Sequence, residues 1–505
     1  MPKNAAKRPA QAVKTAVLNV APETYLVGGS VRDALLGRPV LDLDLCTGQD
    51  SAAEAAAAAA KACGGVPILL DDETDTWRVA AKNPFPFQLD ISPYQGKDEA
   101  ADITRRDFTI NSLYVPLSEV GIAFGKNSLA VSFDRKSVKD RNKGLKDLKA
   151  GIVRMNSASV LKADPLRLLR AFRTAAELGF KIEPATLKAI KSRAKLTSNP
   201  SGERIREELR RILGADKAAQ WISMMDRTGV LCALFPELKP QRTCAIRYYG
   251  KGGVLKHTLS VVERLEHFIS NAEKLYPEFR QGLVQLKERK ATMLLAALLH
   301  DIAKPKTAQI REGRLRFFMH EEEGAALAEA VLERLKSSRA ETRLITHIIR
   351  EHLRPGNLSA NTSISERAVY RFFRDMGPDA IPLLALCWAD YASYVTPSVL
   401  AGLMKKGHRH PPGKIDFQFS KNSPAKTLRH LQVVYLLLEA GVLRREEIEP
   451  QKLVNGKDVM KVLRVEPGPK IGEILEEIRA RQAEGKIRTR EDALRWLSSL
   501  KKGGK

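Results

Sequence analysis

The sequence has few cysteines and no long hydrophobic run. The five cysteines lie far apart and never form a CxxC pair, which argues against a disulfide framework or a structural zinc finger and predicts a reducing, cytoplasmic compartment (Cys46, Cys63, Cys232, Cys244 and Cys387). No run of about 18 uncharged apolar residues occurs, so we expect no membrane span and no membrane partner. The basic N-terminus lacks an apolar run followed by a cleavage site, and residues 1–20 are expected to be a flexible basic segment.

Acidic residues are scarce relative to basic ones. Asp and Glu total 59, whereas Lys and Arg total 84, and the formal net charge is +25. This excess predicts a polyanionic partner, with nucleic acid as the first class to consider. The hydrophobic (44%) and charged (28%) fractions exclude collagen-like, mucin-like and mainly disordered proteins. A chain of 505 residues is too long for one ordinary core and predicts about two to four domains.

The chain changes character near residue 150. Before this point, strand-like and helix-like runs alternate, and from about residue 157 the apolar spacing is helical almost throughout. Ser51 with Glu54 predicts a capping box for the alanine-rich helix, and Gly64 predicts its end. The pattern therefore predicts an α+β protein with an α/β N-terminal part and an all-α remainder.

Two aspartates lie two residues apart in the strand-like run PVLDLDLC. Asp42 and Asp44 should project from one face while Leu41, Leu43 and Leu45 face the core. Paired hard oxygen ligands suit Mg²⁺, and two such ions can activate a hydroxyl and stabilise a leaving pyrophosphate. The alternative is an exposed face of an edge strand, which is the better interpretation of an isolated DxD.

A glycine turn precedes these aspartates. Gly28, Gly29 and Ser30 stand between a strand and a helix start, where glycines let backbone N–H groups approach an anion and the helix dipole favours it. Either feature alone is weak evidence. A phosphate cradle shortly before a metal-binding DxD indicates a nucleotidyltransferase.

Four motifs in order carry a family resemblance. LVGGSVRDALLGRPVLDLDL, RRDFTINSLY, ADPLRLLRAFRTAAELGF and GERIREEL resemble those of the class II tRNA nucleotidyltransferase and bacterial poly(A) polymerase family, over about residues 24–215. The resemblance implies a polymerase-β-like head followed by an all-α neck and body, an HD-type domain and a helical tail. We expect these parts at residues 21–150, 151–248, 249–400 and 401–505.

The resemblance also implies site residues. Metal ligation falls to Asp42 and Asp44, with Asp90 in FQLDIS as a third carboxylate on a neighbouring strand. Nucleotide contacts fall to the glycine turn and to the RRDFTxN motif (Gly28, Gly29, Ser30, Arg32, Arg105, Arg106, Asp107 and Asn111). Adjacent arginines suit phosphate by charge and fork geometry, although a solvated basic surface would show the same pattern.

A third motif offers a way to choose a base without a template. Asp164 and Arg167 lie three apart on one helical face and present an acceptor and a donor. Cytosine and adenine share an amino donor beside a ring-nitrogen acceptor, so one such pair can accept both and refuse uracil and guanine. The alternative is a surface salt bridge. The family usually has Glu-Asp here, whereas this chain has Ala163. Arg170 continues the same basic helix.

Five histidines and two aspartates form a second pattern in the helical part. They resemble the HD phosphohydrolase pattern and imply a bound divalent ion of unknown identity (His257, His300, Asp301, His320, His352 and Asp390). Isolated histidines are usually core or surface fillers, and we give that interpretation to His267, His347, His408, His410 and His430.

These patterns predict an enzyme that adds CMP, AMP or both from CTP and ATP to an RNA 3′ end, above all that of tRNA, by two-Mg²⁺ catalysis. Poly(A) synthesis and metal-dependent phosphohydrolysis by the HD residues are the alternatives. The short segment from Asp90 to Arg105 leaves little chain for the mobile loop that CCA-adding relatives carry there, which favours a CC-adding specialist. The oligomeric state is not predicted.

Overall fold

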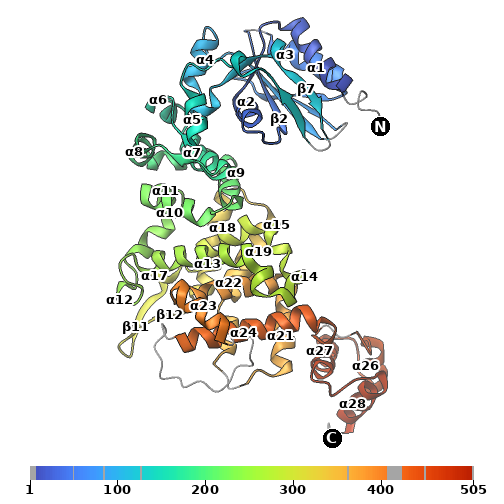
Figure 1. The fold of residues 1–505 in the computed structure, drawn as a ribbon. Helices are drawn as coiled ribbons and strands as arrows, with labels where there is room; N and C mark the ends of the chain where they lie inside the picture. The colour runs from blue at the N-terminus through green and yellow to red at the C-terminus, as the bar shows by residue number, and fades with distance from the viewer. Residues whose placement is uncertain are drawn as a thin grey trace. The chain divides into compact units, whose positions relative to one another are not determined.

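The computed structural model describes residues 7–48, 51–82, 86–125, 128–360, 363–406, 424–448 and 451–502. The chain divides into two compact units, Met1–Glu208 with Met225–Leu234, and Leu209–Met224 with Phe235–Lys505. The main sheet belongs to the first unit, and the second is almost entirely helical (Figure 1). The α+β prediction is confirmed. The finer division into five parts stays a prediction.

A six-stranded mixed sheet forms the framework of the first unit, with strand order β3-β4-β5-β2-β1-β6. Strand β2 lies centrally, parallel to β5 and antiparallel to β1. The strands are β1 (Tyr25–Val27), β2 (Asp42–Thr47), β3 (Val66–Asp71), β4 (Thr76–Ala81), β5 (Phe87–Pro93) and β6 (Tyr114–Pro116), with a separate pair β7 (Gly121–Phe124) and β8 (Leu129–Ser132).

The expectation of a flexible segment over residues 1–20 is wrong for the part that the structure describes. Helix α1 (Lys7–Val20) packs against α3 (Ala52–Cys63). Ala10, Val13 and Val17 are buried, and their spacing places them on one helical face. The charge of this segment is therefore compatible with an amphipathic helix because its small apolar residues form a continuous stripe.

The predicted capping box of α3 is also wrong. Ser51 makes no side-chain cap; its hydroxyl instead donates to the carbonyl of Gly48 at 3.0 Å. The predicted end is confirmed, since Gly64 has a left-handed backbone (φ 64°).

Helices continue the first unit beyond the sheet. They include α2 (Gly28–Leu35), α4 (Glu99–Arg105), α5 (Gly144–Ala150), α6 (Ala158–Ala163), α7 (Leu166–Leu178), α8 (Pro184–Ser192) and α11 (Val230–Leu234), with the short parallel strands β9 (Ile152–Val153) and β10 (Lys181–Ile182). Helices α9 (Gly202–Gly214) and α10 (Ala218–Thr228) contain the points at which the two units divide.

The second unit is a helical body whose long apolar helices pack around α22. Contacts join α13 to α16 and α22, and α22 to α24. Its helices include α12 (Ile246–Tyr249), α13 (Gly253–Leu275), α16 (Lys290–Leu299), α17 (Lys304–Thr307), α18 (His320–Arg334), α19 (Arg339–Glu351), α21 (Glu366–Met376), α22 (Ala380–Ala392), α23 (Pro397–Lys406) and α24 (Pro424–Leu443). One hairpin, β11 (Ala308–Arg311) with β12 (Arg314–Phe317), interrupts them.

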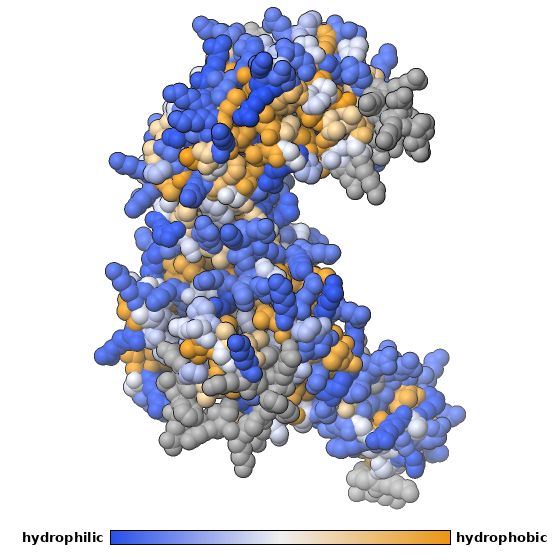
Figure 2. Space-filling view, in the orientation of Figure 1, coloured by the Kyte–Doolittle hydropathy of each residue, from blue (hydrophilic) through white to orange (hydrophobic). Residues whose placement is uncertain are grey.

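The C-terminal helices have a small core of their own. They are α26 (Gly456–Leu463), α27 (Pro469–Ala483) and α28 (Arg490–Lys502), and their buried residues include Val459, Ile478 and Leu497. Figure 2 shows that the visible face of this part is mainly hydrophilic. Among the helices that the structure describes, none is long and apolar enough to cross a membrane.

Candidate nucleotidyltransfer and metal sites

The two aspartates of β2 occupy the positions that the alternation predicted. Leu43 and Leu45 are buried, whereas Asp42 is exposed and Asp44 partly buried. Leu41 is 58% exposed, so its predicted place in the core is wrong, because it precedes the strand. The edge-strand alternative is wrong as well, since β2 lies between β5 and β1.

Asp90 lies next to this pair. Its Cα is the partner of Asp44 in the parallel register of β5 and β2. Its carboxylate accepts two hydrogen bonds from the Arg78 guanidinium, both 2.7 Å long. Burial raises the pKa of Asp44, and Asp90 and Asp42 add to this effect while Arg106 opposes it. The site therefore concentrates negative charge that a cation would stabilise.

The glycine turn lies directly against this charge. Gly28 begins α2 with a left-handed backbone (φ 66°), a conformation that glycine adopts without strain. A Cβ at Gly28 would lie 3.3 Å from both the Asp44 carboxylate and the Arg106 guanidinium, and one at Gly29 would lie 3.5 Å from Asp44. The glycines thus keep side-chain atoms out of the space between the helix start and the carboxylates, where a phosphate chain could approach.

Ser30 connects the turn to β2. Its hydroxyl accepts a hydrogen bond from the Asp44 backbone N–H (2.8 Å) and lies 3.0 Å from the Asp42 carbonyl. In this structure it fixes the first turn of α2 to the aspartate strand. Its predicted nucleotide contact stays a prediction.

The RRDFTIN motif forms a buried polar network. Asp107 pairs with Arg170 at 2.9 Å and accepts a hydrogen bond from the Asn111 amide, whose oxygen accepts one from Arg32 (2.6 Å). Burial alone would raise the pKa of Asp107, but Arg170 and Asn111 hold this pKa below its usual value. Asp107 and Asn111 thereby position two arginines, and Arg106 is fixed by Asp102 (3.0 Å).

The predicted base-reading residues lie where α6 meets α7. Arg167 donates to the carbonyls of Arg105 (2.9 Å) and Val160 (3.2 Å). Asp164 pairs with Arg204 at 3.2 Å rather than with Arg167, so the simple i, i+3 salt bridge is not the arrangement found. Arg167 and the exposed Arg105 line a cavity of about 380 Å³, together with Thr104, Asn142, Asn156, Ser157, Ser159, Val160 and Ala163.

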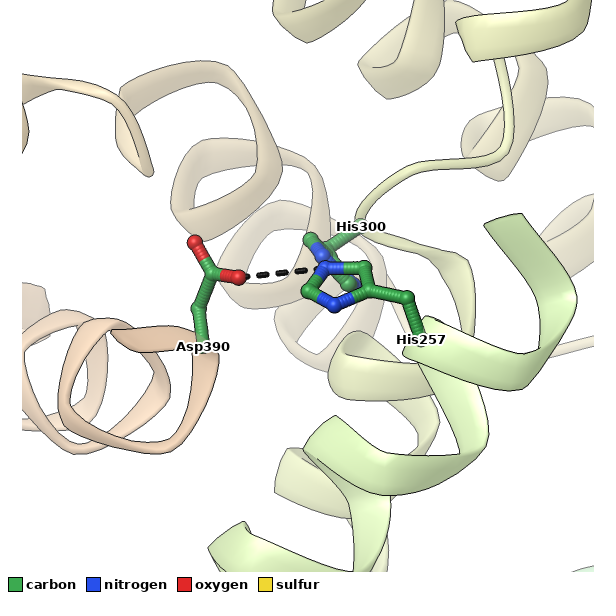
Figure 3. A group of neighbouring side chains, drawn as sticks. All are labelled: His257, His300 and Asp390. Carbon is green, nitrogen blue, oxygen red and sulfur yellow. Dashed lines mark ion pairs between the residues drawn. The ribbon is translucent and has the colours of Figure 1, made fainter. Parts of the chain in front are cut away.

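The HD residues converge in the second unit. His257 of α13, His300 at the end of α16 and Asp390 of α22 form one group (Figure 3), and Asp301, His320 and His352 form another. Asp301 bridges the groups: one carboxylate oxygen lies 3.2 Å from His300 Nε2, and the other lies 3.7 Å from His320 Nε2. His257 Nε2 lies 3.1 Å from Asp390.

These side chains present unsatisfied atoms to a common centre. Four Nδ1 atoms face backbone carbonyls or a hydroxyl (His300 to Ala297, His320 to Phe317, His352 to Ile349 and His257 to Ser393). The opposite Nε2 atoms of His257, His300 and His320 are buried without hydrogen-bond partners. Burial, with His300 and His320, lowers the pKa of His352 to about 3, which keeps its ring neutral. This donor set fits a divalent cation.

The interpretation of the other histidines holds where the structure describes them. His430 is buried and stacks on Tyr391, His347 contacts Asp379, and His267 is exposed. His408 and His410 lie outside the described residues.

Sequence reasoning missed two partners. Arg78 holds Asp90 from β4, and Lys304 Nζ lies 2.5 Å from Asp301. The spacing of Lys304, one helical turn after Asp301, was a usable signal. The Arg78 contact depends on strand register, which local sequence did not reveal.

Family models match along the whole chain. The poly A polymerase head domain matches residues 24–154, the RNA and SrmB-binding site of polymerase A residues 179–242, the HD domain residues 254–394 and tRNA nucleotidyltransferase domain 2 residues 428–497. These matches follow the order in which the two sites and the C-terminal helices occur.

Related proteins have known activities and folds. The chain is 31% identical to an A-adding tRNA nucleotidyltransferase of Deinococcus radiodurans (94% of each chain) and 31% identical to a CC-adding tRNA nucleotidyltransferase of Geobacter sulfurreducens (94% of this chain, 91% of that one). Its fold is similar to that of a CCA-adding enzyme solved with ATP (TM-score 0.62, 22% identity, covering 100% and 96%) and of the Thermotoga maritima CCA-adding enzyme solved with tRNA (TM-score 0.58, 21%, covering 97% and 93%). The chain belongs to the tRNA nucleotidyltransferase family, with a poly(A) polymerase-type head and an HD domain.

Proposed function

We propose that this enzyme adds CMP, AMP or both from CTP and ATP to the 3′ end of tRNA. The observation that carries the proposal is the contact between Asp44, on the central strand, and the Gly28–Gly29 turn. A phosphate cradle that touches a metal-binding carboxylate is what transfer of a nucleotidyl group requires.

The residues of the head divide this task. Asp42 and Asp44, with Asp90 in register beside them, would hold Mg²⁺. When bound, Mg²⁺ activates the RNA hydroxyl and stabilises the pyrophosphate leaving group. The α2 N-terminus, Arg32 and Arg106 would bind the triphosphate, since they border the same cradle. Arg167 and Asp164 would read the base, and Arg105 would face it across the cavity.

CC addition is the form of the reaction that the head favours. The segment between β5 and α4, residues 94–98, is tied down at several points. The Tyr94 N–H donates to Thr47 (3.0 Å), the Gln95 N–H donates to Asp102 (2.9 Å), and Asp98 caps α4. Little free chain is left to remodel the pocket from C to A. The relatives include both CC-adding and A-adding enzymes, so the choice needs its own test.

The test offers three tRNA substrates, ending at the discriminator base, after one C and after two C residues, with CTP alone, ATP alone or both. We expect two C residues on the first substrate and no growth of the third with ATP. Efficient A addition to the CC end would contradict CC specialisation. Long A tails on unrelated RNA would instead support poly(A) synthesis.

A second activity is favoured by the HD centre. Its inward-facing Nε2 atoms lack partners, and Lys304 adds a cation beside Asp301. A divalent ion held there would supply a nucleophilic water for phosphoester hydrolysis. The test measures phosphate release from nucleoside monophosphates, with each divalent metal added in turn, in an Asp42→Ala background that removes the proposed polymerase. Release that disappears in His300→Ala supports hydrolysis, and no release with any metal contradicts it.

A further inference from the structure

The hairpin β11–β12 follows α17 directly and ends just before His320. Glu312 and Gly313 form its two-residue turn, with φ angles of 51° and 68°. Positive φ at both positions matches the hairpin turn whose twist fits the flanking strands. The hairpin is therefore a regular two-stranded ribbon inserted between the two halves of the HD centre.

The two faces of this ribbon differ in chemistry. Arg311 pairs with Arg314, and Gln309 pairs with Arg316, so the three arginines share one face. Ile310 with Leu315 and Ala308 with Phe317 form the other face. We call the first the arginine face. Neighbouring arginines on one strand are about 7 Å apart.

The ribbon is attached through its apolar face. The Lys304 ammonium lies 5.6 Å from the centre of the Phe317 ring, and His320 Nδ1 lies 2.7 Å from the Phe317 carbonyl. The arginine face points to the opposite side of the ribbon, and all residues of both strands except Phe317 are exposed. The arginines thus have access to a large ligand.

The charge on the arginine face is not balanced within the ribbon. Arg311 and Arg314 are direct cross-strand neighbours, and like charges in that position are destabilising. Elsewhere in this unit, Arg334 and Arg350 pair with carboxylates at 2.7 and 2.9 Å. Within the described part of the chain, no ion pair is found for the three ribbon arginines; Arg311 instead stacks on Phe318. A polyanion would relieve this repulsion.

We propose that the arginine face binds the phosphodiester backbone of the tRNA substrate. A row of guanidinium groups matches a repeating anion, because each can bind a phosphate through two parallel hydrogen bonds. Two-stranded ribbons are used by nucleic-acid-binding proteins, and the net charge of +25 favours RNA over less charged partners. The inference rests on the proposed tRNA 3′-end activity, to which it adds a contact far along the chain from the head residues.

The test compares the triple variant Arg311→Gln, Arg314→Gln, Arg316→Gln with the wild-type enzyme. tRNA binding is measured by fluorescence anisotropy from about 50 to about 300 mM salt. We expect binding about tenfold weaker near 150 mM salt and a salt dependence reduced by up to about three ions. The KM for tRNA should rise, whereas the KM for CTP should not.

Two matched controls separate phosphate binding from other effects. The triple Arg→Lys variant keeps the charge and should bind within about threefold of the wild type. The double variant Arg289→Gln, Arg339→Gln removes charge from other exposed positions and should change binding much less. Unchanged tRNA binding in the triple Gln variant, or an equal loss in the Arg289/Arg339 control, would overturn the inference. Failure of the wild type to extend tRNA would refute the proposed function instead, while the binding comparison still tests the ribbon.

Discussion

Asp164 and Arg167 show how one residue pair can be held ready for a base. The carboxylate is fixed by Arg204 and the guanidinium by two backbone carbonyls, so both are oriented before a nucleotide arrives. Such preorganisation lowers the entropic cost of binding. Arg204 supplies an orienting contact in a chain that has Ala163 where the family usually has Glu.

We predict that Asp164→Ala and Arg167→Ala relax selection of C against U. Each variant loses a base-edge contact, a loss on the order of 1–3 kcal/mol, or about 5- to 150-fold in discrimination. The ratio of kcat/KM for CTP to that for UTP measures it. Arg204→Gln is the control, because it breaks the ion pair and keeps both base-facing groups. If this control changed the ratio as much as Asp164→Ala, the two residues would have only a structural role.

His430 gives a residue-scale prediction on stability. Burial, with the neighbouring Lys426, lowers its pKa from 6.5 to about 4. The unfolded chain therefore binds a proton between pH 6.5 and 4 that the folded protein excludes, and the stability contribution is present above pH 6.5 and lost as the pH falls. From pH 7 to pH 5 the free energy of unfolding should drop by about 2 kcal/mol from this group alone.

The measurement compares wild type with His430→Phe by urea unfolding at both pH values. Phe keeps a ring against Tyr391, where the stacked centroids are 4.0 Å apart, and it cannot titrate. The variant should lose about 2 kcal/mol less than the wild type on acidification. Parallel losses in the two proteins would show that the folded protein does not exclude the proton at His430.

At the scale of elements, the end of α16 determines the HD centre. The helix is apolar through Leu299, and His300 and Asp301 follow at its C-terminal end, fully buried. Helices α13, α18, α19 and α22 bring the remaining side chains to the same point.

We predict that His300→Ala with Asp301→Ala removes a divalent metal that the head aspartates do not hold. Metal content of the purified protein, measured by mass spectrometry in an Asp42→Ala background, should fall by about one ion or more per chain. Circular dichroism checks the fold, because the substitution empties a buried polar centre. Equal metal content with and without the HD substitution would mean that these residues hold no ion.

The elements also show what sequence could predict. Alternation in PVLDLDLC placed Asp42 and Asp44 on one face, since strand periodicity is a local property. The central position of β2, the Arg78–Asp90 contact and the bridging role of Asp301 depend on pairing between distant segments, which local pattern does not encode. Helix α1 was missed because its basic residues concealed a stripe of small apolar ones.

At the scale of the molecule, one chain carries two candidate chemical centres, one in each compact unit. Their ligand sets share no residue. Head and HD substitutions should therefore affect separate activities, whereas contacts to RNA, such as those proposed for the ribbon, serve any reaction at the tRNA end.

The central claim is that the head aspartates carry nucleotide addition. Its most direct test is single-turnover incorporation of CMP into tRNA that ends at the discriminator base, by wild type, Asp44→Asn and the His300→Ala, Asp301→Ala variant. We predict that Asp44→Asn lowers the rate at least about a hundredfold while tRNA affinity stays near that of the wild type, because a metal ligand that stabilises transition-state charge is lost. The HD variant should keep its rate. Near-normal incorporation by Asp44→Asn, or its loss only in the HD variant, would contradict the account.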